Sequence, residues 1–465
     1  MRELPPQRVR EYRGATSPRA ALPDCRGGTF ANLSCAKVVA ARDSHIYNND
    51  IKVISMNLTP SLLSQIRENI AAAKRSPFYA KHFAGIEPED IQTEEDFRRL
   101  PFTGKEDLRD AYPLGLCAVP QEDVVRVHSS SGTTGAPVII PYTARDVHDW
   151  AVMFKRCYET AGVTRADRVH ITPGYGMWTA GIGFQLGAEL LGAMAIPMGP
   201  GNTEKQVQML LDLQSTVLTA TSSFALLLAE EIARRGIGDK IALRKGIIGS
   251  ERWGEKMRAR IASELGVELY DIYGLTEIYG PGIGINCQGQ PHMHLWTDYF
   301  FFEIVDPKTG EALPEGTTGE LVITTLRKQG APLIRYRTHD LTREIPGPCP
   351  CGSNFPRIAA ILGRSDDMVK VRGVILYPSR VDELLSGIEG VSSEYQVMID
   401  HLDGRDILTL FFESPLPEGA FYGLEKTVAA LFKEKIGVTP VAKAVKLGDL
   451  PRSEKKTTRI FDNRY

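Results

Sequence analysis

A run of hydroxyl-bearing residues and glycines is the first stretch of the chain that could form a binding loop. Seven consecutive residues are serine, threonine or glycine, namely Ser129, Ser130, Ser131, Gly132, Thr133, Thr134 and Gly135. Hydroxyl and backbone N–H groups at this spacing can hold an anion, and glycine lets the backbone approach it closely. A flexible surface linker has the same composition, but apolar runs at 124–127 and 138–140 favour a tight turn between two strands. We therefore predict a loop that binds phosphate.

An apolar run that ends in a glycine turn carries a second set of reactive groups. Asp271 and Tyr273 precede Gly274, and Thr276 and Glu277 follow it. In open α/β sheets, ligands bind at the carboxyl ends of the strands. At such a place a tyrosine can stack on a planar base, and a carboxylate can hold a Mg²⁺ ion that bridges phosphates. An aromatic core strand with a solvated glutamate is the alternative interpretation.

Charged residues in the last third of the chain could complete a nucleotide site. Asp340 ends the stretch 334–340, and its carboxylate can accept hydrogen bonds from the two hydroxyls of a ribose. Residues 363–373 and 451–457 bring arginines and lysines into loops, where these cations can counter phosphate charge. Taken singly, each of these stretches also fits a solvated surface segment.

Alternating strands and helices must position these groups. Apolar, β-branched runs predict strands at 168–172, 216–221, 246–249 and 267–272. Amphipathic stretches between them predict helices, for example at 204–213 and 255–265. This alternation predicts a parallel sheet and an α/β fold. Runs at 301–305 and 319–324 indicate a more antiparallel or barrel-like piece.

The last hundred residues have the pattern of a separate small unit. Strands are predicted at 368–371, 407–412 and 442–447. Helices are predicted at 380–385 and 425–434. This mixture indicates a compact α+β module of ordinary domain size that begins near 363–367. We expect a chain of three parts: an N-terminal extension over 1–55, a large domain over 56–365 and a small domain over 366–465.

Residues 1–55 are rich in arginine and proline and have little apolar periodicity. We predict a disordered tail, because neither a signal peptide nor an amphipathic transit peptide fits the pattern. Thr59 and Pro60 then predict the start of a helix, as its N-cap and its first residue. Met56, which comes just before them, is therefore a candidate for the natural start of the protein.

The composition excludes several classes of protein. Of the 465 residues, 43% are hydrophobic and 24% are charged, which is typical of a folded globular chain. The net charge of −2 gives no reason to expect nucleic acid as a partner. Seven cysteines are few for a disulfide scaffold, so we expect a reducing, cytoplasmic location. No apolar run approaches the roughly 20 residues of a membrane helix.

Together and in this order, the motifs resemble the adenylate-forming superfamily, which includes acyl-CoA synthetases, luciferases and peptide-synthetase adenylation domains. Within it, the resemblance is to the phenylacetate–CoA ligase family and covers roughly residues 60–465. It implies a large N-terminal domain with parallel sheets and a barrel-like part, followed by a small, mobile α+β domain. It also implies a reaction in two steps, in which ATP adenylates an acid and coenzyme A then takes the acyl group.

The resemblance implies a set of nucleotide contacts. Residues 129–135 would grip the β- and γ-phosphates of ATP. Tyr273 would stack near adenine, Thr276 would bond the α-phosphate, and Glu277 would help to hold Mg²⁺. Asp271 belongs to the same nucleotide-binding stretch. One departure from the family is Ala136, where a lysine is frequent, so one phosphate contact is missing at that position.

Further roles follow from the resemblance in the last third of the chain. Asp340 and Arg364 would bind the ribose, and Asp366 would be the hinge about which the small domain turns. Gly373 would line the tunnel for the pantetheine arm of coenzyme A. Lys456 would be the adenylation lysine, although the neighbouring Lys455 makes the assignment by spacing less specific.

The matching positions for the acid are aromatic or lie in glycine turns. They are Tyr175, Trp178, Ser250, Glu251 and Pro281. Tyrosine and tryptophan suit a flat apolar ring, so we expect an aryl or arylacetic acid, with phenylacetate as the best single choice. Indoleacetate and hydroxylated or amino-substituted benzoates stay open. In the alternative interpretation, these aromatic residues belong to the core.

Three cysteines and a histidine could hold a structural metal ion. Cys349 and Cys351 flank a proline, and Cys287 lies close to His292 and His294. Zinc prefers four sulfur or nitrogen ligands. The arrangement resembles that of relatives with a structural zinc, where His294 rather than His292 matches the family pattern. Ordinary reduced thiols are the alternative.

Two other functions stay open at this point. Enzymes that adenylylate a hydroxyl of a deazaflavin-type coenzyme resemble the same superfamily. A degenerate, non-catalytic sensor of aryl acids is the other, although Lys456, Glu277 and Asp340 argue against it. The sequence also leaves a homodimer open.

Overall fold

The computed structural model describes residues 58–130, 136–251, 253–402, 405–452 and 458–464. The N-terminal extension with Met56, the loop residues 131–135 and Lys456 lie outside these ranges. Helix α1 (Pro60–Ala73) begins as predicted, because the Thr59 hydroxyl accepts a hydrogen bond from the Leu62 N–H group and Pro60 takes the first position. Three short helices follow: α2 (Pro77–His82), α3 (Glu94–Arg98) and α4 (Lys105–Asp110).

A large mixed sheet forms the centre of the chain. Within the described residues its strand order is β13-β14-β9-β8-β7-β6-β5-β3-β4. The strands are β3 (Arg168–Ile171), β4 (Met194–Pro197), β5 (Val217–Thr221), β6 (Lys245–Gly249), β7 (Glu268–Leu275), β8 (Gly280–Asn286), β9 (Met293–Leu295), β13 (Glu344–Ile345) and β14 (Arg357–Ile358). Strands β4, β3, β5, β6 and β7 run parallel, which confirms the α/β fold predicted from the sequence.

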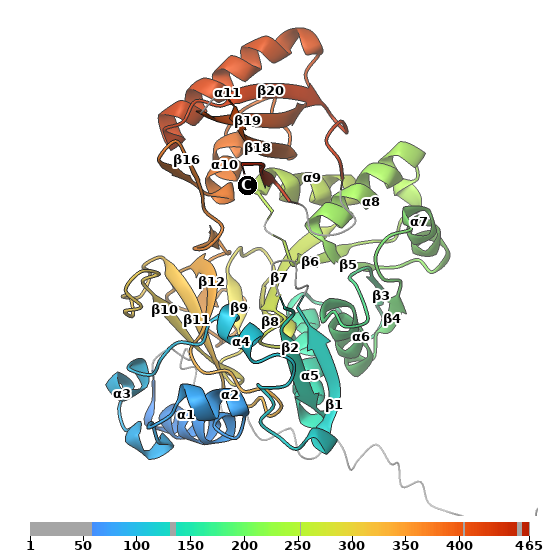
Figure 1. The fold of residues 1–465 in the computed structure, drawn as a ribbon. Helices are drawn as coiled ribbons and strands as arrows, with labels where there is room; N and C mark the ends of the chain where they lie inside the picture. Colours follow the sequence, from blue (N-terminus) through green and yellow to red (C-terminus); the bar gives the residue numbers. More distant parts are fainter. Residues whose placement is uncertain (1–57, 131–135, 252, 403–404, 453–457, 465) are drawn as a thin grey trace, which may run out of the picture. The chain divides into compact units, whose positions relative to one another are not determined.

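Helices cover both faces of this sheet, since successive residues of a strand point to opposite sides. Val217 and Ile247 pack in one core with α5 (Ala144–Thr160) and α6 (Ala180–Leu191). Their neighbours Leu218 and Ile248 pack in a second core with α7 (Thr203–Asp212), α8 (Ser222–Arg235) and α9 (Glu255–Leu265). The two layers fix the parallel strands so that their carboxyl ends share one edge (Figure 1).

Two antiparallel sheets complete the large part of the chain. The hairpin of β1 (Val124–Ser129) and β2 (Ile139–Thr143) flanks the predicted phosphate loop. The other sheet has the order β10-β11-β12-β15, with β10 (Phe300–Val305), β11 (Gly319–Thr325), β12 (Tyr336–Thr342) and β15 (Gly363–Arg364). It is the antiparallel piece that the runs at 301–305 and 319–324 predict.

The C-terminal residues form an α+β unit with a hydrophobic core of their own, which includes Val397, Leu410 and Phe432. Its sheet has the order β20-β19-β18-β21, with β18 (Tyr395–Leu402), β19 (Arg405–Ser414), β20 (Val441–Lys446) and β21 (Ile460–Asp462). Its other elements are the hairpin β16 (Val369–Val371) and β17 (Val374–Leu376) and the helices α10 (Pro378–Ser386) and α11 (Phe421–Ile436).

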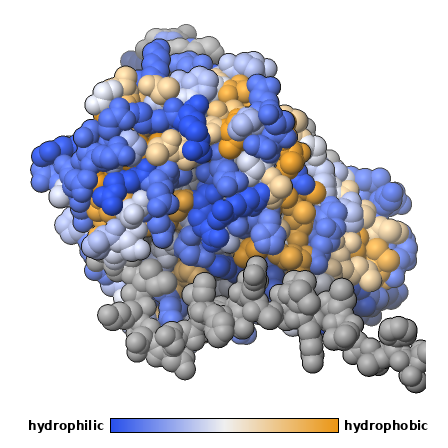
Figure 2. Space-filling view, turned by 90° about the horizontal axis from the view of Figure 1, so that it is seen from below, coloured by the Kyte–Doolittle hydropathy of each residue, from blue (hydrophilic) through white to orange (hydrophobic). Residues whose placement is uncertain are grey.

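On the face drawn in Figure 2, hydrophobic residues form small groups separated by hydrophilic ones. Among the described segments, every helix falls short of the length and apolarity that a membrane span requires.

Candidate functional site

The predicted binding residues follow the parallel strands at their common edge. The carboxyl ends of β3, β5, β6 and β7 lead into segments 172–179, 222–223, 250–251 and 276–277. This edge is where open α/β sheets bind their ligands. The fold therefore gathers segments that are up to a hundred residues apart in the sequence.

Hydrogen bonds join the base of the predicted phosphate loop to the segment after β3, and that segment to the turn after β7. The Ser129 N–H group donates to the Met177 carbonyl at 2.9 Å, which ties β1 to the loop that carries the predicted acid-binding aromatics. In the same loop, the Thr179 hydroxyl lies 3.5 Å from the hydroxyl of Thr276. The aromatic loop thus contacts both the base of the predicted phosphate loop and the turn after β7, while residues 131–135 lie outside the described ranges.

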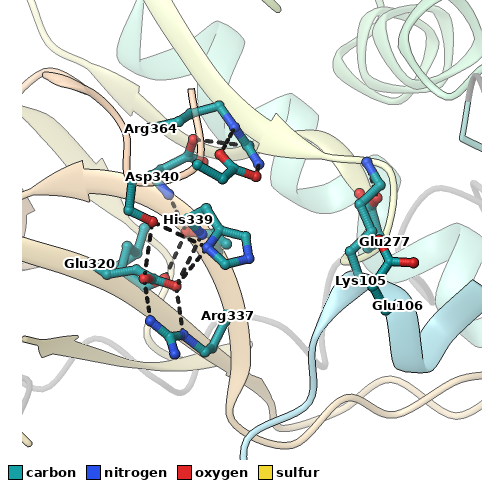
Figure 3. A network of polar contacts seen from close by, with 12 residues as sticks. Lys105, Glu106, Glu277, Glu320, Arg337, His339, Asp340 and Arg364 are labelled. Atoms are coloured by element: carbon teal, nitrogen blue, oxygen red, sulfur yellow. Dashed lines mark hydrogen bonds and ion pairs between the residues drawn. The ribbon is translucent and has the colours of Figure 1, made fainter. Parts of the chain in front are cut away.

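Glu277 is buried at this meeting point beside an ammonium that no sequence motif had indicated. Its carboxylate lies 3.3 Å from the Nζ atom of Lys105, the first residue of α4, and Figure 3 shows the two side chains together. Thr103 anchors this segment, since its N–H group donates to the Arg335 carbonyl and its own carbonyl accepts from the Arg337 N–H group. The pair places a positive charge beside the carboxylate of Glu277.

Asp340 lies on β12 opposite Arg364 of β15, so the two predicted ribose ligands are neighbours. The Tyr273 hydroxyl donates to Asp340 at 2.6 Å. The guanidinium of Arg364 reaches the other carboxylate oxygen of Asp340 at 3.4 Å, and Figure 3 shows these two side chains side by side. Burial raises the pKa of Asp340, although the Tyr273 hydroxyl and Arg364 oppose the shift. Arg364 also binds the predicted hinge residue Asp366 through two hydrogen bonds of 2.8 Å. The structure therefore brings four of the predicted residues into one polar cluster.

The buried carboxylate of Glu320 contacts residues on both sides of this cluster. Glu320 accepts hydrogen bonds from the guanidinium of Arg337, the backbone N–H of His339 and the hydroxyl of Ser365. Burial opposes ionisation, but His339 and Arg337 outweigh it and lower the pKa of Glu320 to about 2. His339 has φ of 63°, a left-handed conformation that is strained for an L residue and is characteristic of functional sites. Its ring lies within 3.1 Å of the Ser365 hydroxyl, so Glu320 and His339 together link the strand of Asp340 to the segment of Arg364.

The loop predicted to bind the acid lies against the turn after β7. Gly280 has φ of 103°, and a Cβ atom there would lie 2.6 Å from the Cβ of Thr179, so only glycine permits this approach. In the loop, the Trp178 side chain is 46% exposed, whereas the Tyr175 ring packs against the core. The predicted residue Pro281 is buried. The structure thus brings Trp178, Tyr175 and Pro281 to adjoining segments.

Glu251 and Ser250 follow β6, and the structure gives Glu251 specific partners. One carboxylate oxygen accepts hydrogen bonds of 2.8 to 3.0 Å from both hydroxyls of Ser222 and Ser223 and from the Ser223 N–H group. These donors belong to the first turn of α8, where a negative charge is favoured. Ser250 is exposed and has φ of 70°. Glu251 thereby fixes the turn in which Ser250 faces the solvent.

Two further predicted residues lie in different surroundings. Asp271 is shielded within β7, where burial raises its pKa to about 6 against the opposing charge of Arg258, 3.7 Å away.

Gly373 lies in the C-terminal unit, at φ of 83°, and lines an open groove of about 510 Å³. Other residues along this groove are Lys370, Arg372, Asp406, Asp462 and Arg464. The groove offers both cationic and anionic side chains beside the backbone of Gly373.

Cys287, His294, Cys349 and Cys351 converge although they come from separate segments. Their ligand atoms all lie within 4.8 Å of one another. The Sγ atoms of Cys287 and Cys349 are 3.5 Å apart, and the Cys351 Sγ lies 3.3 Å from Nε2 of His294. The other ring nitrogen of His294 is 3.0 Å from the Phe355 carbonyl, which leaves Nε2 directed at the thiols. Three sulfurs and one nitrogen with such outer support are the donors that zinc prefers.

Comparison with family models matches both parts of the chain. Residues 38–326 match the AMP-binding enzyme family, and residues 373–464 match the AMP-binding enzyme C-terminal domain. Among solved structures, a 2-hydroxyisobutyryl-CoA ligase in the postadenylation state has a TM-score of 0.79 and 26% sequence identity. That comparison covers 86% of this chain and 89% of the other.

Curated relatives narrow the family. The phenylacetate-coenzyme A ligase of Pseudomonas putida is 42% identical over 397 residues, which cover 83% of this chain and 90% of the relative. The enzyme of the same name from Escherichia coli K12 is 40% identical over 403 residues, which cover 84% and 92% of the two chains. The chain therefore belongs to the phenylacetate–CoA ligase family of the adenylate-forming enzymes, and it is an AMP-forming acid–CoA ligase.

Proposed function

We propose that the chain joins an aryl or arylacetic acid, with phenylacetate as the first candidate, to coenzyme A in a reaction driven by ATP. The observation that carries this proposal is the meeting of three segments at one sheet edge: the base of the phosphate loop, the aromatic loop 174–179 and the turn with Thr276 and Glu277. Relatives about 40% identical that are named phenylacetate-coenzyme A ligase support the choice of acid.

In the first proposed step, the carboxylate of the acid attacks the α-phosphorus of ATP and pyrophosphate leaves. Residues 129–135 hold the β- and γ-phosphates, and Thr276 donates to the α-phosphate. Glu277 helps to hold Mg²⁺, which neutralises phosphate charge, and the ammonium beside this carboxylate supports the fit of a cation. Lys456 stabilises the charge that develops during adenylation. Because a free carboxylate is a poor electrophile, this step supplies the leaving group that the acid lacks.

The nucleoside of ATP is proposed to lie beside β7 and β12. Tyr273 stacks near adenine, Asp271 belongs to the same stretch, and Asp340 and Arg364 bind the ribose hydroxyls. The hydrogen bond from Tyr273 to Asp340 supports this arrangement, because it holds the base-stacking ring and the ribose carboxylate in a fixed relation. Preorganisation of this kind lowers the entropic cost of bringing the reacting groups together.

In the second proposed step, the thiol of coenzyme A attacks the acyl carbon and AMP leaves. We propose a small domain over 366–465 that turns about Asp366 between the two steps and a large domain over 56–365. The separate core of the C-terminal unit supports this division. Gly373 would then line the pantetheine tunnel, which its position on an open groove supports. Motion of one domain lets a single site serve two reactions.

The acid itself is proposed to lie against Tyr175 and Trp178, with Ser250, Glu251 and Pro281 around it. An exposed tryptophan at the edge of the sheet supports an aromatic partner. Indoleacetate and substituted benzoates are the other acids that such a site would suit. Among the described residues, no contact favours the alternative function, which is adenylylation of a hydroxyl of a deazaflavin-type coenzyme.

A panel of acids tests the proposed substrate. We expect the purified chain, with ATP, Mg²⁺ and coenzyme A, to convert phenylacetate to a thioester whose mass identifies it. Indoleacetate, benzoate, aminobenzoate and hydroxybenzoate complete the aryl set, and acetate serves as a control without a ring. A thioester of another aryl acid formed faster than that of phenylacetate would replace the first candidate, and activity with acetate alone would contradict the aryl class.

Cys287, His294, Cys349 and Cys351 are proposed to hold a structural zinc ion that fastens residues 349–351 to β9. We expect protein purified without chelator to contain about one zinc per chain, because the four donors complete a tetrahedral set. Removal of the metal should lower the melting temperature. Cys351→Ser should release the zinc, whereas Cys117→Ser, at a free cysteine outside the cluster, should retain it. Wild-type protein without metal would favour the alternative of reduced thiols.

The cellular location and the oligomeric state of the enzyme are also proposals. The described cysteines are free, which supports a reducing, cytoplasmic location. A homodimer is a further proposal, for which the measured mass of the protein in solution is the test.

A further inference from the structure

Lys328 is a buried lysine that neither the sequence motifs nor the proposed reaction uses. It lies between β11 and β12, and only 2% of the residue is exposed. Its Nζ atom donates to the Ile278 carbonyl at 2.6 Å and lies 3.9 Å from the ring centres of both Tyr142 and Tyr279. Among the described residues, no carboxylate comes within ion-pair distance of it. A buried ammonium without a paired anion is costly, so its retention calls for a role.

The backbone around Lys328 is fastened from several sides. The buried carboxylate of Asp146 in α5 accepts the N–H groups of Gln329 and Gly330, each at 2.8 Å. A Cβ atom at Gly330 would lie 2.4 Å from the Pro141 carbonyl, so the loop touches the backbone of β2 directly. These contacts hold the backbone on the C-terminal side of Lys328, and the hydrogen bond to the Ile278 carbonyl holds its ammonium.

The groups around the ammonium of Lys328 come from β2, which follows the predicted phosphate loop, and from the turn after β7. Tyr142 lies on β2, the strand that leaves the phosphate loop, and its hydroxyl donates to the Tyr279 carbonyl at 3.0 Å. Two successive carbonyls, those of Ile278 and Tyr279, are thus bound by buried donors immediately after Glu277. These two hydrogen bonds fix the carbonyls one and two residues after Glu277, and so restrain the end of the turn that carries Thr276 and Glu277.

We propose that Lys328 is a positioning residue for adenylation, because its ammonium fixes the Ile278 carbonyl and thereby the turn that carries Thr276 and Glu277. The proposal rests on the roles in ATP use that are proposed above for these two residues. It follows that Lys328 is required for the use of MgATP and is dispensable once the acyl-adenylate has formed. Its interaction with the two tyrosine rings is of the cation–π kind, which depends on the positive charge.

The charge of Lys328 is set by its surroundings. Burial lowers the pKa of its ammonium to about 7, and the carboxylate of Asp146 opposes the shift. Burial lowers the pKa of His128 to about 4 and raises the pKa of both tyrosines, so these three groups are uncharged at neutral pH. The groups that face Lys328 are His128 from β1, Tyr142 from β2, Asp146 from α5 and Tyr279 from the turn after β7. Arg126, Asp149 and Glu277 act in turn on these neighbours. The ammonium is protonated below this pKa, so kcat/KM for MgATP should fall as the pH rises through about 7.

The substitution Lys328→Met tests the proposal, since it keeps the length of the side chain and removes its charge and its donors. We expect kcat/KM for MgATP, measured by pyrophosphate release, to fall by about tenfold to a hundredfold and to lose its alkaline decline. Thioester formation from synthetic phenylacetyl-adenylate and coenzyme A should stay within about threefold of wild type. The matched control is Lys245→Met, which removes a half-buried lysine over the ring of Tyr270 at the amino end of β6 and should leave both reactions unchanged.

Three results would overturn the proposal. They are a Lys328→Met enzyme that uses MgATP as well as wild type, an equal loss in both half-reactions, and persistence of the alkaline decline in the variant. If the variant does not fold, the wild-type pH profile decides, because a decline near pH 7 must appear for MgATP and be absent for the synthetic adenylate. Wild-type protein that releases no pyrophosphate with any acid of the panel would instead contradict the proposed function, which is a different outcome.

Discussion

Replacing Lys456 by alanine is expected to abolish formation of the acyl-adenylate and to spare the transfer of a synthetic acyl-adenylate to coenzyme A. The reason is electrostatic, since the lysine is proposed to stabilise charge that develops only while the carboxylate attacks the α-phosphorus. Loss of one such preorganised donor lowers kcat by about 10²- to 10³-fold, and an ammonium is among the stronger donors. Pyrophosphate release and thioester formation, measured separately, report the two steps.

The neighbouring residue provides the matched control for this experiment. Lys455 has the same side chain one position earlier, and the spacing from Pro451 selects Lys456 rather than Lys455. Lys455→Ala should therefore keep adenylation within about threefold of wild type. Lys456 lies outside the described residues, so the assignment depends on this spacing alone. Survival of both steps in Lys456→Ala, or loss of adenylation in Lys455→Ala, would show that the assignment is wrong.

Glu277→Gln is the second substitution with a large expected effect. The change keeps the size of the side chain and removes the charge that is proposed to hold Mg²⁺ beside the phosphates. We expect kcat for adenylation to fall by about 10²-fold or more, and the Mg²⁺ concentration required for half-maximal rate to rise. Titration of pyrophosphate release with Mg²⁺ at saturating ATP measures both quantities.

Glu106→Gln is the control for Glu277→Gln. Glu106 follows Lys105 in α4 and pairs with Arg109, while its side chain is 80% exposed. The substitution Glu106→Gln therefore removes a glutamate carboxylate close to Lys105 but away from the sheet edge. The Mg²⁺ dependence of pyrophosphate release should not change. An unchanged Mg²⁺ requirement in Glu277→Gln would contradict the metal-holding role, whatever happens to the rate.

The elements that could be predicted are those whose local signals agree with their packing. Helix α9 is found at Glu255–Leu265, as its periodicity predicts, and Gly266 ends it with φ of 64°. Strand β8 (Gly280–Asn286) could not be predicted, because a run rich in glycine and proline resembles a turn. It is a buried strand paired with β7 and β9, and the indole N–H groups of Trp150 and Trp296 donate to its Pro281 and Gly282 carbonyls. Such long-range donors leave no trace in the local sequence.

The same distinction applies to the site. The residues after β3, β6 and β7 could be predicted to meet, because parallel strands bring their carboxyl ends to one edge. Lys105 and Lys328 were missed, since each lies in a polar stretch that is typical of solvent-exposed segments. They reach the site because contacts with remote segments hold their loops, through backbone hydrogen bonds of Thr103 in one case and the side-chain carboxylate of Asp146 in the other. The Glu251 contacts with Ser222 and Ser223 depend on tertiary structure in the same way.

The central claim is that the clustered groups activate a carboxyl group on the α-phosphate of ATP, and an isotope experiment tests it most directly. The chain is incubated with ATP, Mg²⁺, coenzyme A and phenylacetate labelled with oxygen-18 in its carboxylate, or with the best acid of the panel. If the carboxylate oxygen attacks the α-phosphorus, the AMP released by coenzyme A carries one labelled oxygen and the pyrophosphate carries none. Thioester accompanied by unlabelled AMP, or label in the pyrophosphate, would contradict the claim.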